Sequence, residues 1–281
     1  MEILGYFAAL FIGLSLGLFG GGGSILTVPT LVYLIGLNPV IATAYSLFIV
    51  GLTSLVGSYK FYKKGLVSVK TALVFGLPSI VAVYGTRRYL VPAIPEHIFS
   101  IGNFELTKGV LLMLLFAVLM VFASLSMIRK NKPATAPGAS IRESDKPHQE
   151  RPKTPVPEQK FNYPLIWGEG LLVGTLTGLV GAGGGFLIIP ALVLFSKLDM
   201  KMAVGTSLLI IATNSLIGFT GDVANYEIDW LFLVIFSIIP IVGIFIGTWL
   251  SAKIKAEKLK TAFGWFVLVM GVYILLKELL G

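Results

Sequence analysis

Residues 17–29 read Gly-Leu-Phe-Gly-Gly-Gly-Gly-Ser-Ile-Leu-Thr-Val-Pro, and residues 178–190 read Gly-Leu-Val-Gly-Ala-Gly-Gly-Gly-Phe-Leu-Ile-Ile-Pro. Both stretches place a run of glycines and a proline inside long apolar sequence, where each glycine costs a helix about 1 kcal/mol relative to alanine. We therefore expect a helix to break at each run. Within a membrane, the freed backbone N–H and C=O groups cannot face lipid, so they must face protein or a water-filled cavity.

The two stretches belong to an internal repeat. A shift of 161 positions aligns 17–57 with 178–218 without a gap, and 17 of the 41 aligned positions are identical. Apolar composition alone does not bring glycines, prolines and serines into register. The matched positions include Gly20/Gly181, Gly22/Gly183, Gly23/Gly184, Pro29/Pro190, Ser46/Ser207, Ser54/Ser215 and, after one inserted residue, Pro78/Pro240 and Gly85/Gly247. Such internal repeats are common in secondary transporters.

The composition indicates a membrane protein. Hydrophobic residues make up 56% of the 281 residues and charged residues only 13%, which is about half the usual charged share of globular proteins. The chain has no cysteine and only two histidines, His97 and His148, so disulfides and thiolate metal sites are excluded. The net charge of +8 is explained by Lys and Arg in cytoplasmic loops. We expect no cofactor and no nucleic-acid partner.

Apolar stretches of roughly 20 residues can cross a lipid bilayer as helices. We expect an all-α polytopic membrane protein with about eight spanning helices and two short half-helices after the glycine breaks. The expected spans are 3–19, 39–59, 66–86, 108–128, 163–180, 203–220, 230–251 and 261–279, and the expected half-helices are 24–37 and 186–196.

A charged segment separates the two apolar halves. Residues 129–160 contain 12 of the 36 charged residues and six of the 14 prolines, so they cannot build an apolar core and are predicted to be a flexible linker. The predicted organisation is a first membrane repeat at 1–128, the charged linker at 129–162 and a second membrane repeat at 163–281.

The distribution of Lys and Arg predicts the orientation. If each half-helix returns the chain to the side from which it came, 18 Lys and Arg lie on one side of the membrane and 4 on the other. If each half-helix instead continues the preceding span, the split is 13 to 9. The positive-inside rule favours the first arrangement. It predicts inverted repeats in the plasma membrane, a cytoplasmic linker and both termini outside.

The glycine breaks are the strongest candidate binding site. A half-helix that begins at a break points free N–H groups and a partial positive charge into the interior, which suits an anion. Close helix packing is the alternative use of such glycines. The residues that we assign to an anion site at the breaks are Gly20, Gly21, Gly22, Gly23, Ser24, Gly181, Gly183, Gly184 and Gly185.

Polar residues at matched depths of two spans could complete the site by donating hydrogen bonds to an oxyanion. The residues that we assign to this shell are Tyr45, Ser46, Thr206, Ser207 and Asn214. Hydrogen bonding between helices is an equal alternative for Ser46, Thr206 and Ser207, and the favoured one for Ser54 and Ser215.

Charged residues within the spans are few. Glu169 and Lys70 lie close to the ends of their helices, where they can reach water. Arg87 and Arg88 lie at the outer end of a span, where they could attract anions, but the favoured expectation is that they are solvated at the helix end. Asn38 precedes a span and is predicted to cap its helix.

One enzyme motif occurs. Gly13-Leu-Ser15-Leu-Gly17 fits the Gly-x-Ser-x-Gly pattern of serine hydrolases, but that motif requires a strand–turn–helix elbow and a histidine partner. Here the pattern lies in an apolar helix, so we interpret it as chance and expect no enzyme activity.

The two glycine–proline stretches, together with Ala203-Val-Gly-Thr206-Ser207, resemble the sulfite exporter TauE/SafE family of membrane permeases. The resemblance extends over nearly all of the chain except the linker. It implies passage of small sulfur oxyanions or organosulfonates, such as sulfite, sulfoacetate or thiosulfate, and export by alternating access. The alternative is a cation transporter or channel in which the carbonyls of the same broken helices coordinate the ion.

Overall fold

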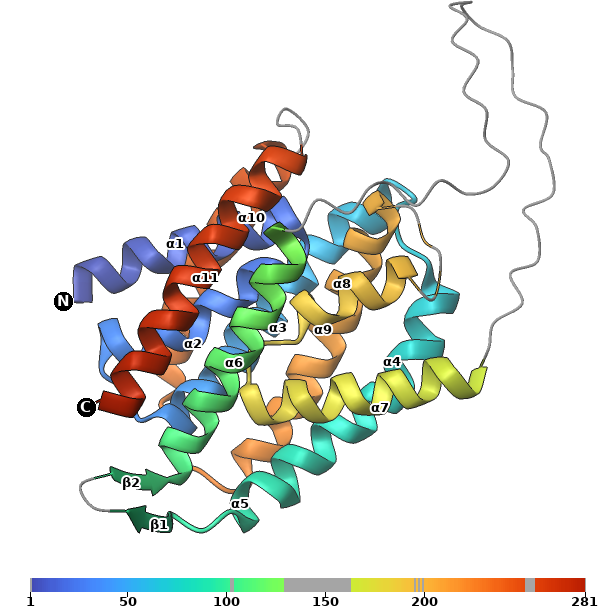
Figure 1. Ribbon diagram of the computed structural model, residues 1–281. Coiled ribbons are helices and arrows are strands. Elements are labelled where there is room, and N and C mark those ends of the chain that lie inside the picture. The colour runs from blue at the N-terminus through green and yellow to red at the C-terminus, as the bar shows by residue number, and fades with distance from the viewer. Residues whose placement is uncertain are drawn as a thin grey trace, which may run out of the picture.

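A computed structural model describes residues 2–101, 104–128, 163–194, 196, 198, 200–250 and 256–280, so the predicted linker at 129–162 lies outside the described residues. The chain is mostly helical (Figure 1). The α-helices are α1 (Glu2–Phe19), α2 (Thr27–Pro29), α3 (Pro39–Lys63), α4 (Val69–Gly85), α5 (Val91–Ala93), α6 (Lys108–Ile128), α7 (Tyr163–Val180), α8 (Gly185–Leu194), α9 (Met200–Val223), α10 (Trp230–Leu250) and α11 (Ala256–Leu280). A 3₁₀ segment, η1 (Gly22–Leu26), two π-helical segments, η2 (Thr30–Ile35) and η3 (Thr86–Leu90), and two strands, β1 (His97–Ile101) and β2 (Phe104–Thr107), complete the elements.

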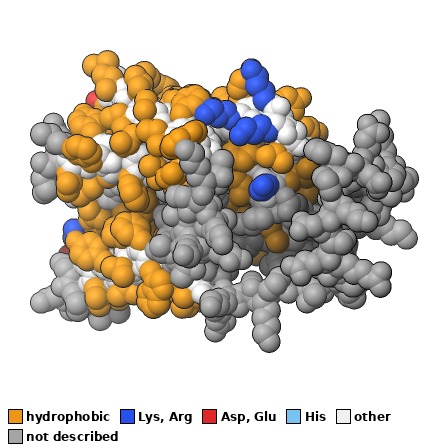
Figure 2. All heavy atoms as spheres, turned by 90° about the horizontal axis from the view of Figure 1, so that it is seen from above, with side chains coloured by type: hydrophobic (Ala, Val, Ile, Leu, Met, Phe, Trp, Pro, Cys, Tyr) orange, Lys and Arg blue, Asp and Glu red, His pale blue; other side chains and the backbone are white. Residues whose placement is uncertain are grey.

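Among the described residues, five helices are long and apolar enough to cross a membrane. They are Pro39–Lys63, Val69–Ala93, Lys108–Leu125, Lys201–Val223 and Trp230–Leu250. Three further apolar helices are shorter, at Leu4–Phe19, Gly23–Ile35 and Ile166–Val180. Hydrophobic side chains cover much of the coloured surface on the face shown in Figure 2, and Leu231 and Val81 are 73% and 68% exposed. The expected all-α membrane protein is therefore confirmed, but the expected number of eight spans is not, since five helices of the described residues meet the criterion. The structure also adds the antiparallel hairpin of β1 and β2 before α6.

The first helix of each half packs on the opposite half. α1 lies against α10, and α7 lies against α4. Glycines allow these contacts, because a side chain at Gly13 of α1 would overlap the backbone of Pro240, and one at Gly174 of α7 would overlap the backbone of Ser79. Gly13 and Gly174 occupy equivalent positions of the internal repeat.

α3 and α9 cross at the centre of the molecule, and α6 packs against α11 at its edge (Figure 1). Burial confirms this arrangement, since 72% of the apolar window of both α3 and α9 is buried, against 39–44% for the other three long helices. The predicted cap of α3 is also confirmed, because the Asn38 side chain accepts a hydrogen bond of 2.9 Å from the backbone N–H of Val40. The two central helices thus provide the surfaces on which both glycine breaks rest.

Candidate anion site

Both glycine runs end a helix in the same way. α1 ends at Phe19 and α7 at Val180, and each is followed by a glycine in the left-handed region, Gly20 at φ +75° and Gly181 at φ +72°. Each of these glycines donates its N–H to a carbonyl four residues earlier, at 2.8 Å. Only glycine adopts this conformation at little cost, which explains why the repeat keeps it at both positions.

The segments after the two breaks differ from each other. The expected half-helix at 24–37 is an irregular helix in which η1, α2 and η2 follow one another until Gly36, at φ +86°, ends it. The expected half-helix at 186–196 is the regular α8, Gly185–Leu194. The difference has a local cause, since Gly183 and Gly184 are both left-handed (φ +67°) and turn the chain before α8 begins, whereas Gly22 and Gly23 already lie inside η1.

The two breaks meet inside the protein. A side chain at Gly21 would overlap the Cα atom of Gly185, and a side chain at Gly185 would overlap the backbone of Gly21. Both residues are buried. The N-terminus of α8 therefore lies against the backbone of the first break, as expected if the two breaks form one site.

Each break also rests on the central helix of the opposite half. Gly20 faces Val204 of α9, and Gly181 faces Thr43 of α3. Thr43 and Val204 are equivalent in the repeat, so the two contacts are related by it. Other glycines let each break pack against the preceding helix of its own half. A side chain at Gly23 would overlap Ser15 of α1, and one at Gly184 would overlap Thr177 of α7. The glycines of each break therefore allow close packing against neighbouring helices, and they leave the backbone of the break without side chains that would cover it.

Buried polar atoms without hydrogen-bond partners among the described residues gather on the central helices. They include the hydroxyls of Ser46, Ser54 and Ser215 and the carbonyl oxygen of the Asn214 side chain. Ser215 lies beside the second break, because its Oγ is 3.1 Å from where a Cβ of Gly183 would stand. The hydrogen bonds between helices that the sequence favoured for Ser54 and Ser215 are not formed with any described residue.

The other shell residues already have partners. The Asn214 amide donates to the hydroxyl of Ser79 at 2.6 Å, and Ser207 donates to the Val204 carbonyl in its own helix at 2.8 Å. In the first break, Ser24 donates to the Gly21 carbonyl at 2.7 Å. These bonds leave the Asn214 carbonyl oxygen as the free end of its side chain.

Tyr45 and Thr206, which are equivalent in the repeat, hold the starts of two other helices. The Tyr45 hydroxyl accepts the backbone N–H of Asp229 at 2.7 Å, and the Thr206 hydroxyl accepts the backbone N–H of Ser68 at 2.9 Å. Their hydroxyls are therefore engaged at the beginnings of α10 and α4.

A buried ion pair lies beside the second break. Arg87 of η3 and Asp222 of α9 both have side chains that are 0% exposed, and Arg87 Nη1 lies 3.6 Å from Asp222 Oδ1. Arg87 Nη1 also donates to the Thr43 hydroxyl at 3.0 Å. The Nη2 atom occupies the space into which a side chain at Gly181 would project. The expected solvated position of Arg87 is therefore wrong, because α9 covers it.

Little in the sequence indicates this ion pair. Arg87 ends an apolar span and Asp222 begins an acidic stretch, and each position alone suits a helix end in water. The available signal was a departure from the repeat, since Arg87 corresponds to Trp249 and Asp222 to Phe61. Each charged residue of the pair thus has an aromatic residue at the equivalent position, so the repeat contains one such ion pair and not two.

The hydrolase motif is not assembled with a histidine in the described part of the chain. Ser15 is buried within α1 and donates to the Ile12 carbonyl at 2.8 Å, and His97 is exposed on β1. Glu169 is partly buried on α7, and Lys70 is exposed at the start of α4.

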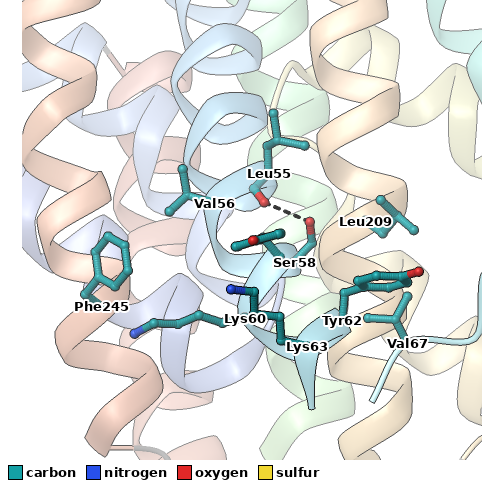
Figure 3. A pocket seen from close by; sticks show the side chains of 10 residues that line it. Leu55, Val56, Ser58, Lys60, Tyr62, Lys63, Val67, Leu209 and Phe245 are labelled. Carbon is teal, nitrogen blue, oxygen red and sulfur yellow. Dashed lines mark hydrogen bonds between the residues drawn. The ribbon is translucent and has the colours of Figure 1, made fainter. Parts of the chain in front are cut away.

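An open groove of about 700 Å³ lies away from the breaks, near the end of α3 (Figure 3). Its lining is mainly apolar, with Leu55 and Phe245 among its residues, and Lys60 and Lys63 reach into it. The Lys60 ammonium lies 4.2 Å from the centre of the Phe245 ring. None of the residues assigned to the anion site lines this groove.

Comparison with known proteins agrees with the membrane fold. The family model of the sulfite exporter TauE/SafE matches residues 5–274. A probable membrane transporter protein of Xylella fastidiosa (strain 9a5c) is 33% identical over 267 residues, which are 94% of this chain and 91% of that protein. The probable membrane transporter protein YunE of Bacillus subtilis (strain 168) is 26% identical over 271 residues, 92% of this chain and 89% of that protein. No solved structure matches the chain.

Proposed function

The chain belongs to the sulfite exporter TauE/SafE family of membrane transporters, and on that premise we propose that it exports a small sulfur-containing anion across the plasma membrane. The substrate class is sulfite, thiosulfate or an organosulfonate such as sulfoacetate. The observation that carries the proposal is the contact between Gly21 and Gly185, which places two backbone breaks at one buried point.

Backbone groups at this point suit an oxyanion. At the start of α8, Leu187 and Ile188 both donate their N–H groups to the Gly184 carbonyl. The N–H groups of Gly185 and Phe186 precede these bonds, and the helix dipole places a partial positive charge there. The SO₃ group that sulfite, thiosulfate and sulfonates share presents several acceptor oxygens, and helix N-termini are a common site for oxyanions. The Ser215 hydroxyl of α9, beside Gly183, supplies a further donor, and we assign the unpartnered Ser46 hydroxyl of α3 to the same shell.

Gly20, Gly21, Gly23 and residues 181–185 are buried, so an anion reaches them only after the surrounding helices move. We propose alternating access by two inverted repeats. In each half, the first helix packs on a helix of the other half: α1 packs on α10, and α7 packs on α4. This reciprocal packing supports the proposal, because the two halves make equivalent contacts. The proposed cytoplasmic side is the one that carries Lys63, Lys64 and Lys70.

Transport by purified protein in sealed vesicles tests the proposal. Vesicles loaded with labelled sulfite, thiosulfate or sulfoacetate should release these anions faster than protein-free vesicles, and monovalent or divalent cations should not be released. Gly22→Leu and Gly183→Leu should abolish release while the protein still inserts, because each fills a break with a side chain. A matched control is Gly85→Leu, since no atom lies within 4 Å of the Cβ position there.

Release of a cation by the wild type, with none of the three anions released, would favour the cation alternative. Normal sulfite release by both break variants would show that the glycine runs serve only packing.

A further inference from the structure

The backbone groups of the proposed site have no formal charge, but a buried cation, the Arg87 side chain, lies beside one of the two breaks. Arg87 is 0% exposed, and its Nη2 lies against Gly181. Its Nε and Nη2 atoms have no hydrogen-bond partner among the described residues. Buried guanidinium N–H groups normally find acceptors, and a planar guanidinium binds two oxygens of one oxyanion at once.

The counter-ion of Arg87 is held loosely. Asp222 Oδ1 lies 3.6 Å from Arg87 Nη1, which is beyond hydrogen-bond length, and neither Asp222 oxygen has a hydrogen-bond partner among the described residues. A buried carboxylate without such bonds is costly to keep charged. The pair is therefore electrically balanced but poorly bonded, so another oxyanion can compete with Asp222 for Arg87.

Charge balance decides what happens when an anion arrives. Arg87 and Asp222 together are neutral, so a bound monoanion would leave one uncompensated negative charge in a buried place. A proton on Asp222 restores neutrality. The proton comes from solution onto a carboxylate oxygen of Asp222, Arg87 keeps its own protons, and the anion takes up hydrogen bonds from Arg87.

We propose that Arg87 is the cationic anchor of the transported anion and that Asp222 takes up one proton as the anion binds. The inference rests on the proposed function and deepens it, because it assigns a charged residue and a coupling proton to the same site. It also makes the two halves unequal, since the equivalents of Thr43, Arg87 and Asp222 are Val204, Trp249 and Phe61.

The surroundings contain few other groups that could take this proton. Tyr226, in the turn after α9, is a titratable neighbour of the pair. Burial, reinforced by the Asp222 carboxylate, raises the pKa of its hydroxyl above the usual value, so it stays neutral. Thr43 of α3 is uncharged, and α8 has no titratable residue. Glu96 is exposed and bound by Lys108 at 2.9 Å, and Arg88 is partly exposed.

Glu227 and Asp229, in the turn after α9, are exposed, and Lys201 is at the opposite end of α9 from Asp222. The other charged groups on the packed elements lie far along their helices. Lys60 and Lys63 follow Thr43 by 17 or more residues of α3, or roughly 25 Å at 1.5 Å per residue. Lys70 is at the opposite end of α4 from η3, and Glu169 is 11 residues before the end of α7, about 16 Å by the same measure. Asp222 is therefore the group in position to respond to a charge at Arg87.

The test is calorimetric titration of methanesulfonate, which stays ionised across the physiological pH range, into the purified protein. Repeating it in buffers of different ionisation enthalpy counts protons. The wild type should take up about one proton per anion bound. Asp222→Asn should bind without proton uptake and with an affinity that no longer depends on pH.

Arg87→Gln alone leaves Asp222 without its partner and risks misfolding, so the decisive variant is Arg87→Gln combined with Asp222→Asn, which removes both charges. It should fold and insert normally but bind methanesulfonate at least about 10-fold more weakly, because charge-assisted hydrogen bonds are lost. Arg88→Gln is the matched control and should bind as the wild type does.

The outcomes distinguish the role of Arg87 and Asp222 from the proposed transport function. If the wild type binds methanesulfonate but the double variant binds it equally well, or if the wild type takes up no proton, this inference is overturned while the proposed function stands. If the wild type binds neither methanesulfonate nor sulfite, the proposed function is wrong and the anchor falls with it.

Discussion

The hydroxyls of Tyr45 and Thr206 make the same bond at equivalent places in the two halves. Each accepts the backbone N–H of a residue that caps a helix of the other half, Asp229 before α10 and Ser68 before α4. Both caps are in use, since the Asp229 carboxylate accepts the N–H of Phe232 and the Ser68 hydroxyl accepts the N–H of Thr71. The central helices thus fix where the helices of the opposite half begin.

We expect Tyr45→Phe and Thr206→Val to lower the free energy of unfolding by about 1 kcal/mol each, because each removes one hydrogen bond to backbone. Transport per correctly folded molecule should change little. Thermal unfolding in detergent, paired with vesicle transport at matched protein amounts, measures both effects. Lost transport at unchanged stability would instead place these hydroxyls on the substrate.

Ser46→Ala and Ser215→Ala should behave in the opposite way. Their hydroxyls have no partner among the described residues, so removing them should leave the unfolding temperature unchanged or slightly higher. If they bind the anion, sulfite affinity should fall about 10-fold for each, the equivalent of one hydrogen bond. Ser207→Ala is the control, because that hydroxyl is already bonded within α9.

Gly21→Ala and Gly185→Ala should each disrupt the whole site. A methyl group at either position overlaps the backbone of the other break, so one substitution displaces both. We expect transport to fall at least about 10-fold for either change, with partial loss of stability of about 1–3 kcal/mol from overpacking. Gly76→Ala, which meets no atom within 4 Å, should retain wild-type transport and stability. A single variant with half the wild-type activity would indicate two independent sites.

The orientation can be tested with single cysteines, because the chain has none of its own. Asn225, exposed after α9, should label with an impermeant thiol reagent from outside the cell. Lys64, exposed at the end of α3, and Ala139, in the predicted linker, should label only after the membrane is permeabilised. Labelling of Asn225 and Lys64 from the same side would rule out the inverted arrangement.

Local rules predicted much of the fold. The helix breaks after Phe19 and Val180, the cap at Asn38 and the long apolar helices α3, α4, α6, α9 and α10 follow from glycine conformation, capping chemistry and hydrophobic length. These features depend on residues close together in the sequence. The hairpin of β1 and β2 was not foreseen, because its residues alternate weakly between polar and apolar and lie at a loop between spans.

The ion pair shows why the remaining features could not be predicted from the sequence. Arg87 and Asp222 are 135 positions apart, and neither flanking sequence indicates that η3 and α9 come together. Their approach depends on Gly221, where an added Cβ would stand 3.1 Å from the Cβ of Arg87. The burial of this charge is therefore a property of the tertiary packing.

The pairing of α1 with α10 also bears on how the protein is made. About 210 residues separate the end of α1 from the start of α10, which at 5–20 residues per second is roughly 10–40 s of synthesis. During that interval α1, whose glycine-lined face fits the α10 backbone, remains in the bilayer without its final neighbour. α4 likewise waits for α7. The nascent N-terminal half is thus an incomplete membrane domain until the ribosome has nearly finished, and the two halves should reassemble when they are produced as separate polypeptides.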